Sequence, residues 1–264
     1  MNFYQFAYHY HFGDVPEGFA KDAAVARIQK HEPLPSKTFE NFFTVLLLCL
    51  ERDPRFCPMA VRFSKHAHDM KKLLKGYDPR EIAKLNAGAL YEGFSHIFLI
   101  GNKEWSDFFH RFASAIMDGA TFLASFKTPQ AFLSFVESFQ GTPDTRVALP
   151  VYLFSLMPNV PMSVLLQWLQ WLGNLSYCNP DPAVIEVMHL LDSDVKNLIS
   201  ALRAMNVLAG HCHVSVYSLN ELLSSICEGG KDIGLLEKPV YAKRRFETAI
   251  AEWKKTHSGY RQLF

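Results

Sequence analysis

The stretch 150-PVYLFSLMPNVPMSVLLQWLQWLGNLSYCNPDPAVIEVMHLL-191 decides how this chain folds. A short turn, MPNVPM, separates two apolar runs, and NPDPAV opens a third. In the second run the leucines at 165, 166, 169 and 172 recur at helical spacing, without the alternation typical of a strand. The stretch therefore predicts a helix-turn-helix at about 150–173, followed by a helix that begins next to Asp181.

The same helical spacing recurs along most of the chain. Proline breaks and capping residues mark several helix starts, such as Ser36 or Thr38, Asp78 before Pro79, and Thr128. We expect helices over residues 39–50, 80–100, 106–122, 130–139, 194–208 and 218–227. The exception is FYQFAYHYHF near the N-terminus, where apolar and polar residues alternate unevenly, so a strand is also possible there. The sequence thus predicts an all-α fold, and its length allows either two lobes or one large domain.

Length and composition fit an ordinary globular protein. The chain has 264 residues, 49% of them hydrophobic and 20% charged. The longest nearly uncharged apolar run, 42–50, is too short to span a bilayer, and the N-terminus lacks the regions of a signal peptide. The five cysteines are an odd number without a CxxC pair. We therefore expect a reducing, cytoplasmic location, no membrane partner and no disulfide framework.

The overall charge is close to neutral, at +1. A protein whose whole surface grips phosphates is usually more basic. The densest basic segment is 238-KPVYAKRRFETAIAEWKK-255, and a smaller cluster covers Lys71, Lys72 and Lys75. For both segments the simpler interpretation is a solvated helix face opposite an apolar one.

Several short motifs in one order resemble the helix-hairpin-helix DNA glycosylase superfamily. In its glycosylase-like branch a leucine–proline pair, a hairpin, a KPD-type turn and a TPY-type segment follow one another. The matching residues here are Leu149-Pro150, Met157 to Ser163, Asn179-Pro180-Asp181 and Val216-Tyr217. The resemblance covers about the C-terminal half of the chain. It implies a single two-lobed unit over 1–264, with a glycosylase-like core at 80–229 and accessory helices at 1–79 and 230–264.

The resemblance implies that the hairpin holds a phosphate of double-stranded DNA. A helix start offers unpaired N–H groups and a favourable dipole to such an anion. Asn159 and Pro161 occupy the two positions where this family usually has glycine, and Pro161 has no N–H to donate. The amides of Met162 and Ser163 remain available, so Asn159, Met162 and Ser163 are the candidate phosphate-binding residues.

Asp181 matches the family's carboxylate, which faces the sugar of a base flipped out of the duplex. There a carboxylate stabilises the positive charge that develops when the glycosidic bond breaks. By its residues alone, Asp181 before Pro182 is an N-cap followed by proline at the first helical position, and the two roles are compatible. Gln167 and Tyr217 are secondary candidates for contacts with DNA.

Ser163 stands where bifunctional members of the family have a lysine nucleophile. The resemblance therefore implies a monofunctional DNA glycosylase without a lyase step. The alternative is a catalytically silent protein of the same fold that acts as a DNA- or protein-binding module. Near-neutral charge, Pro161 and the missing lysine favour the alternative, whereas Asp181 favours the enzyme.

The sequence indicates no cofactor and no metal site. His211 and His213 flank Cys212, but adjacent residues rarely converge on one ion, and no second ligand pair stands at zinc spacing. Nucleotide-binding and hydrolase motifs are absent from the sequence. The spacing of Trp168 and Trp171 is typical of a helix packed in the core and favours that role over base stacking.

Overall fold

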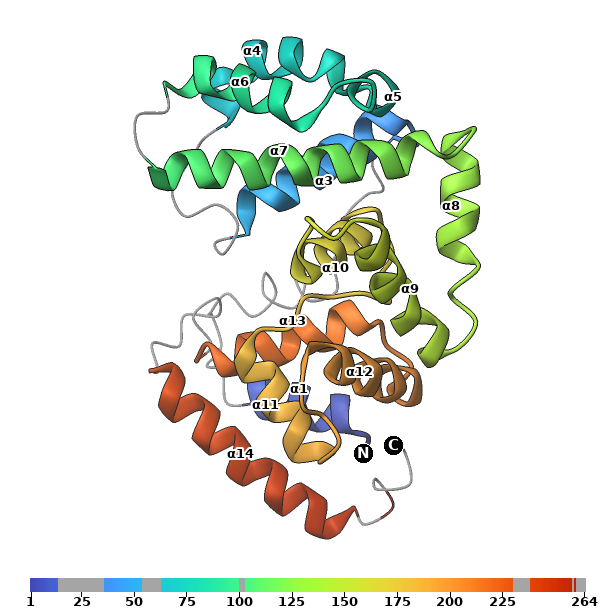
Figure 1. Ribbon diagram of the computed structural model, residues 1–264. Helices are drawn as coiled ribbons and strands as arrows, with labels where there is room; N and C mark the ends of the chain where they lie inside the picture. The colour runs from blue at the N-terminus through green and yellow to red at the C-terminus, as the bar shows by residue number, and fades with distance from the viewer. Residues whose placement is uncertain (14–35, 54–62, 100–102, 230–237, 258, 260–264) are drawn as a thin grey trace. The chain divides into compact units, whose positions relative to one another are not determined.

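The computed structural model of the chain describes residues 1–13, 36–53, 63–99, 103–229, 238–257 and 259 (Figure 1). Throughout these ranges the regular structure is helical and contains no strand, which confirms the all-α prediction. The N-terminal segment, for which the sequence also allowed a strand, forms helix α1 (Phe3–Gly13). This helix buries Phe3 and Ala7, which are four residues apart. None of the helices in these ranges is long and apolar enough to cross a membrane.

The chain divides into two compact units. The first combines residues 1–32 with 174–264, and the second spans 33–173. The hairpin at 150–173 therefore belongs to the second unit and Asp181 to the first. The division falls inside the 80–229 segment, whose glycosylase-like character stays a prediction.

The second unit is built around the long helix α7 (Lys103–Ala124), which packs against α3, α5 and α6. In chain order its elements are α3 (Phe39–Arg52), η1 (Phe63–His66), α4 (Ala67–Leu73), η2 (Lys75–Tyr77), α5 (Pro79–Ile82), α6 (Ala87–Phe98), α7, α8 (Pro129–Glu137), α9 (Pro143–Leu156) and α10 (Met162–Trp171). Phenylalanines fill much of the core, and Phe112 stacks on Phe63 with ring centroids 4.8 Å apart. In Figure 1, α3 and α6 both lie along α7.

Most of the expected helix starts in this unit are confirmed. The hydroxyl of Thr38 accepts a hydrogen bond from the Asn41 N–H, and Asp78 and Thr128 cap α5 and α8 in the same manner. The single helix expected over 80–100 is wrong, because α5 ends at Ile82 and α6 begins at Ala87. The cause is Asn86, whose side-chain oxygen accepts from the Ala89 N–H and starts a new helix.

The first unit surrounds helix α13 (Val216–Cys227), which packs against α1, α11 (Pro182–Leu191), α12 (Leu198–Cys212) and α14 (Pro239–Thr256). Helix α12 starts four residues later than the expected position 194, because Asn197 forms a capping box with Ser200. Helix α14 buries Phe246, Ile250 and Trp253 and exposes Arg244, Arg245 and Lys255, as predicted for a solvated basic face.

Candidate functional site

The hairpin consists of α9, a turn from Met157 to Pro161, and α10. The Met157 N–H donates to the Leu153 carbonyl at 2.8 Å and ends α9, and the Val160 N–H donates to the Met157 carbonyl at 3.0 Å and closes the turn. Pro161 then takes an extended conformation (φ −58°, ψ 147°) and caps α10 without a side-chain hydrogen bond. The sequence therefore positions both helices and the turn between them as expected.

The turn is held from within the protein by Asp118 of α7. The Oδ2 atom of Asp118 accepts a hydrogen bond from the Asn159 backbone N–H at 2.8 Å and another from the Asn159 side-chain amide at 3.0 Å. Hydrogen bonds to an ionised carboxylate are stronger than those between neutral groups. The turn amide expected to bind DNA phosphate thus already has an anionic acceptor.

A second carboxylate lies at the start of α10. The Ser163 hydroxyl donates to Oδ2 of Asp53 at 2.5 Å, and both residues are buried. Asp53 ends α3, so this bond joins the end of one helix to the beginning of another. A negative charge at a helix N-terminus interacts favourably with the helix dipole. Ser163 therefore serves packing inside the unit, and its side chain is not available at the surface.

The remaining donors at the start of α10 include the backbone amides of Met162 and Ser163. Neither amide has an acceptor within hydrogen-bond distance in the described parts of the chain. These are the first N–H groups of the helix, which the helix itself leaves unpaired. Because Asp53 and Asp118 both bond to this end of the hairpin, a phosphate here would meet two neighbouring negative charges.

Helix α10 is fixed to α3 by its tryptophans. The Trp168 indole N–H donates to the Phe42 carbonyl at 2.9 Å, and Trp168 is fully buried. The guanidinium of Arg52 lies 4.7 Å from the centre of the Trp171 ring, a cation–π geometry. The core role expected of Trp168 is confirmed. Gln167, on the same helix, is half-buried.

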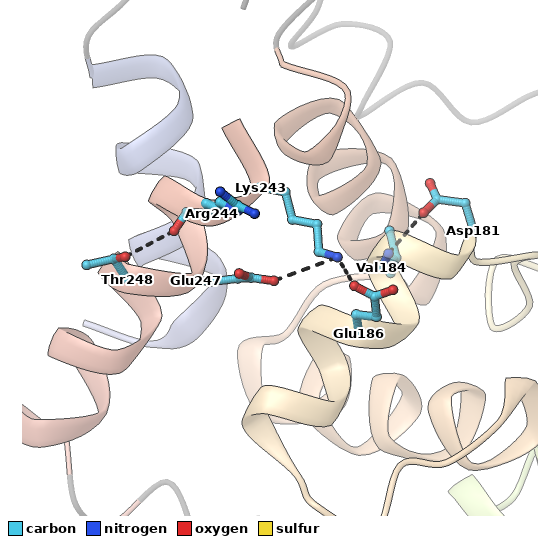
Figure 2. A network of polar contacts seen from close by, with 7 residues as sticks. All are labelled: Asp181, Val184, Glu186, Lys243, Arg244, Glu247 and Thr248. Atoms are coloured by element: carbon cyan, nitrogen blue, oxygen red, sulfur yellow. Dashed lines mark hydrogen bonds and ion pairs between the residues drawn. The ribbon is translucent and has the colours of Figure 1, made fainter. Parts of the chain in front are cut away.

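Asp181 is the N-cap of α11, as the Asp-Pro pair predicts. Its Oδ1 atom accepts from the Val184 N–H at 2.9 Å (Figure 2), and its Oδ2 atom accepts from the Ser224 hydroxyl of α13 at 3.2 Å. The side chain is half-buried. Ser224 is a partner that the sequence did not indicate, since it lies 43 residues further along the chain. Both bonds stabilise a carboxylate.

A charged cluster beside Asp181 ties α14 to α11. Lys243 of α14 extends toward α11 and pairs with Glu186, and its ammonium group lies 3.8 Å from Glu247 one turn along its own helix (Figure 2). The Lys243 side chain is 25% exposed, whereas that of Glu186 is 57% exposed. This cluster is an ordinary helix-to-helix contact with its charges paired.

Tyr217 lies in the same unit as Asp181. Its backbone N–H donates to the Leu175 carbonyl at 3.1 Å, and its side chain is half-buried at the start of α13. The candidate residues thus fall into two groups. Asn159, Met162, Ser163 and Gln167 belong to the second unit, and Asp181 and Tyr217 belong to the first.

Helix α9 exposes an apolar face that the sequence pattern did not predict. Val151, Tyr152, Phe154 and Leu156 are 42–46% exposed. Tyr152 also contacts the rings of Phe135 and Phe139. Helix α9 is apolar on nearly all sides, so the residue pattern did not reveal which side faces solvent. In hindsight, the uncharged run 147-VALPVYLFSL-156 was the available signal.

No group of three or more His, Cys, Asp or Glu side chains in the described segments is placed to hold a metal ion. His213 ends α12 in a left-handed conformation with φ 57°, which is a structural role. In comparisons with known proteins, no protein-family model, no curated protein and no solved structure matches the chain.

Proposed function

We propose that this chain is a catalytically silent helical module that binds another protein through the exposed apolar face of α9. The observation that carries the proposal is the set of four large apolar side chains on one helix, each exposed by more than two fifths of its surface. Contiguous exposed apolar surface of this kind marks protein–protein interaction sites. An apolar helix face with an aromatic centre fits a groove or a second helix on a partner protein.

Burial of these side chains from water favours a partner with an apolar surface. Removing a large apolar side chain from water contributes about 1.5–3 kcal/mol when its burial is complete. Tyr152 already rests against the ring of Phe139, with centroids 6.3 Å apart, so less side-chain freedom remains to be lost on binding. Tyrosine is also among the residues that most often dominate the affinity of an interface.

The hairpin turn supports the same proposal, because several of its donors already form hydrogen bonds inside the protein. Asp118 accepts one hydrogen bond from the Asn159 backbone and one from its side-chain amide, and Asp53 accepts the bond of the Ser163 hydroxyl. A phosphate-binding site needs free hydrogen-bond donors and an electrostatic environment that is positive or neutral. These internal bonds argue for the protein-binding alternative over a DNA contact at the hairpin.

The proposal is tested with a matched pair of double variants. Val151→Lys with Phe154→Lys places charge on the α9 face, and Val240→Lys with Tyr241→Lys does the same at two exposed apolar residues of α14. Proteins retained by the wild-type chain are identified, purified and titrated against all three forms. We expect the α9 variant to weaken binding by about tenfold or more, as loss of interface anchors does, and the α14 variant to bind normally.

Circular dichroism of both variants verifies that the helices are intact. Equal affinity of the α9 variant and the wild type for every purified partner would refute the proposal. Equal weakening by both variants would show that the effect is not specific to α9.

A second candidate is a monofunctional DNA glycosylase acting on double-stranded DNA. The observation that favours it is the half-exposed Asp181 carboxylate at the start of α11, held by the Val184 N–H and the Ser224 hydroxyl. Its test is base excision on a panel of damaged duplexes with the wild type and Asp181→Asn. Excision by the wild type that Asp181→Asn abolishes would support the glycosylase function. Failure of the wild type to excise any of the lesions would exclude this function.

A further inference from the structure

A basic surface runs along the short helix α4 of the second unit, and we call it the α4 basic face. It comprises the exposed side chains of Lys65, His68, Lys71, Lys72 and Lys75. Within α4, His68, Lys71 and Lys72 follow the i, i+3, i+4 spacing that places side chains on one side of a helix. Met70 and Leu74 are buried and hold α4 against the rest of the unit.

The α4 basic face has an excess of positive charge. Residues 65–75 contain four lysines and one aspartate, a formal charge of +3, whereas the whole chain carries +1. None of these four lysines forms an ion pair with a described residue, whereas Lys84, Lys243 and Lys255 each pair with a glutamate. The residues of this unit outside the described ranges, 33–35, 54–62 and 100–102, contain no Asp or Glu. The charge of this face therefore remains open to an anionic partner.

An exposed leucine lies close to the start of the α4 basic face. Leu99 ends α6 in a left-handed conformation, with φ 50°, and its side chain is 85% exposed. Glycine is the usual residue at such a helix end. The preceding residue, Phe98, contacts the ring of His66 edge to face, with centroids 4.9 Å apart, and His66 directly precedes α4. Unpaired lysines and a large exposed apolar side chain thus occur together in this part of the unit.

We infer that the α4 basic face binds the surface of an anionic phospholipid bilayer. The lysine ammonium groups interact with the anionic headgroups, and Leu99 enters the boundary between headgroups and acyl chains. Binding to a bilayer surface strengthens with buried apolar area and with electrostatic attraction to anionic lipids. The exposed leucine favours a bilayer over a nucleic acid, whose phosphates attract lysines equally but offer no apolar layer.

Such peripheral binding requires no membrane-spanning segment, and the sequence expectation of no membrane partner concerns spanning and signal segments only. The α4 basic face also lies on other elements than α9. It therefore does not depend on the proposed protein-binding function.

The first experiment sediments the full chain with two kinds of vesicle. One contains phosphatidylcholine alone, and the other contains phosphatidylcholine and phosphatidylserine in equal parts. At about 0.1 M salt we expect binding to the anionic vesicles to be about tenfold stronger or more, and at about 1 M salt we expect it to be lost, because salt screens the lysines. A short DNA duplex is titrated under the same conditions as an alternative polyanion.

A triple variant tests the lysines. Lys71→Gln with Lys72→Gln and Lys75→Gln should weaken binding to the anionic vesicles by about 100-fold, since each lysine near such a surface contributes about fivefold. The matched control removes the same charge from the exposed face of α14, with glutamine at 244, 245 and 255, and should weaken binding much less. Circular dichroism verifies that both triple variants keep their helices.

A single variant tests the apolar contact. Leu99→Ser should weaken binding to the anionic vesicles by about tenfold, because the leucine no longer leaves water. Val240→Ser, at a valine of α14 that is also exposed, should have little effect.

Three outcomes would each overturn the inference: no binding to the anionic vesicles at low salt, equal weakening by the two triple variants, or an unchanged affinity of Leu99→Ser. Salt-sensitive binding of the DNA duplex through the α4 lysines, without binding to vesicles, would also overturn it and identify a nucleic acid as the partner of this face.

Discussion

Asp118 of α7 accepts two hydrogen bonds from Asn159, one from its backbone and one from its side chain, although the residues are 41 positions apart in the chain. This relationship fixes the turn of the α9–α10 hairpin to the central helix of its unit. It also places a carboxylate where the resemblance to DNA glycosylases implies a phosphate. The hairpin is therefore stabilised by an anion that the protein itself supplies.

Removing this carboxylate should destabilise the second unit. Asp118→Ala leaves two donors of Asn159 without their charged acceptor, and we expect the free energy of unfolding to fall by about 1–3 kcal/mol. Urea unfolding followed by circular dichroism measures the change. Asp107→Ala on the exposed face of the same helix is the matched control and should change stability by less than about 0.5 kcal/mol. Equal effects of the two substitutions would contradict the role given to Asp118.

The Ser163–Asp53 bond should be equally important for stability. Ser163→Ala removes a hydroxyl from a buried carboxylate, a loss expected to cost about 1–3 kcal/mol. Ser155→Ala, at an exposed serine of α9, should be close to neutral. A double-mutant cycle with Asp53→Asn isolates the pair, and a coupling energy near zero would mean that the two residues act independently.

The capping role of Asp181 predicts different outcomes for two substitutions. Asp181→Ala removes the acceptor for the Val184 N–H and should cost about 1 kcal/mol, whereas Asp181→Asn keeps a good N-cap and should cost less. Asp194→Ala, at an exposed aspartate before α12, serves as the control. Thermal unfolding of the three variants measures these differences in stability. Because Asp181→Asn preserves the cap, any effect of this variant on base excision would report chemistry and not misfolding.

The cysteines of the described segments should be unreactive in the folded protein. Burial raises the pKa of the Cys49, Cys178, Cys212 and Cys227 thiols, and that of Cys227 reaches about 12, with Asp181 as a smaller cause. At pH 8, iodoacetamide followed by peptide mapping should modify these four only after unfolding, because the thiolate is the reactive form. Rapid modification of any of the four in the native protein would contradict the packing described.

The same shift gives stability a defined dependence on pH. The folded chain holds the Cys227 proton more tightly than the unfolded chain, whose thiol has an ordinary pKa of 9.0. Its contribution to stability is therefore fully present below pH 9 and is lost as the pH rises toward 12. Cys227→Ser should reduce the decline in unfolding free energy across this range, and an unchanged decline would assign it to other groups.

Local patterns predicted most of the helices and several of their starts. Apolar spacing located α3, α7 and α13, and Asp78, Thr128 and Asp181 cap helices where the sequence places a capping residue before proline. Such signals act over three or four residues, so they are visible without tertiary structure. The break at Asn86 was missed because the apolar spacing continues across it.

The candidate site was less predictable because its decisive contacts join distant residues. Ser163 and Asp53 are 110 positions apart, and Asp181 and Ser224 are 43 apart. No spacing rule connects such pairs. The exposed face of α9 was hidden for a different reason: a helix that is apolar all round does not indicate which side the core covers.

Crosslinking at two positions of one hairpin distinguishes protein binding by α9 from DNA binding by the turn. A photo-crosslinking phenylalanine derivative is introduced at Tyr152 on α9 or at Pro158 in the turn, both exposed, and each form is irradiated in an extract containing both protein and DNA. We predict discrete protein adducts from position 152 and none from position 158. Nuclease-sensitive adducts from position 158, with no protein adduct from position 152, would contradict the account and restore the hairpin as a DNA contact.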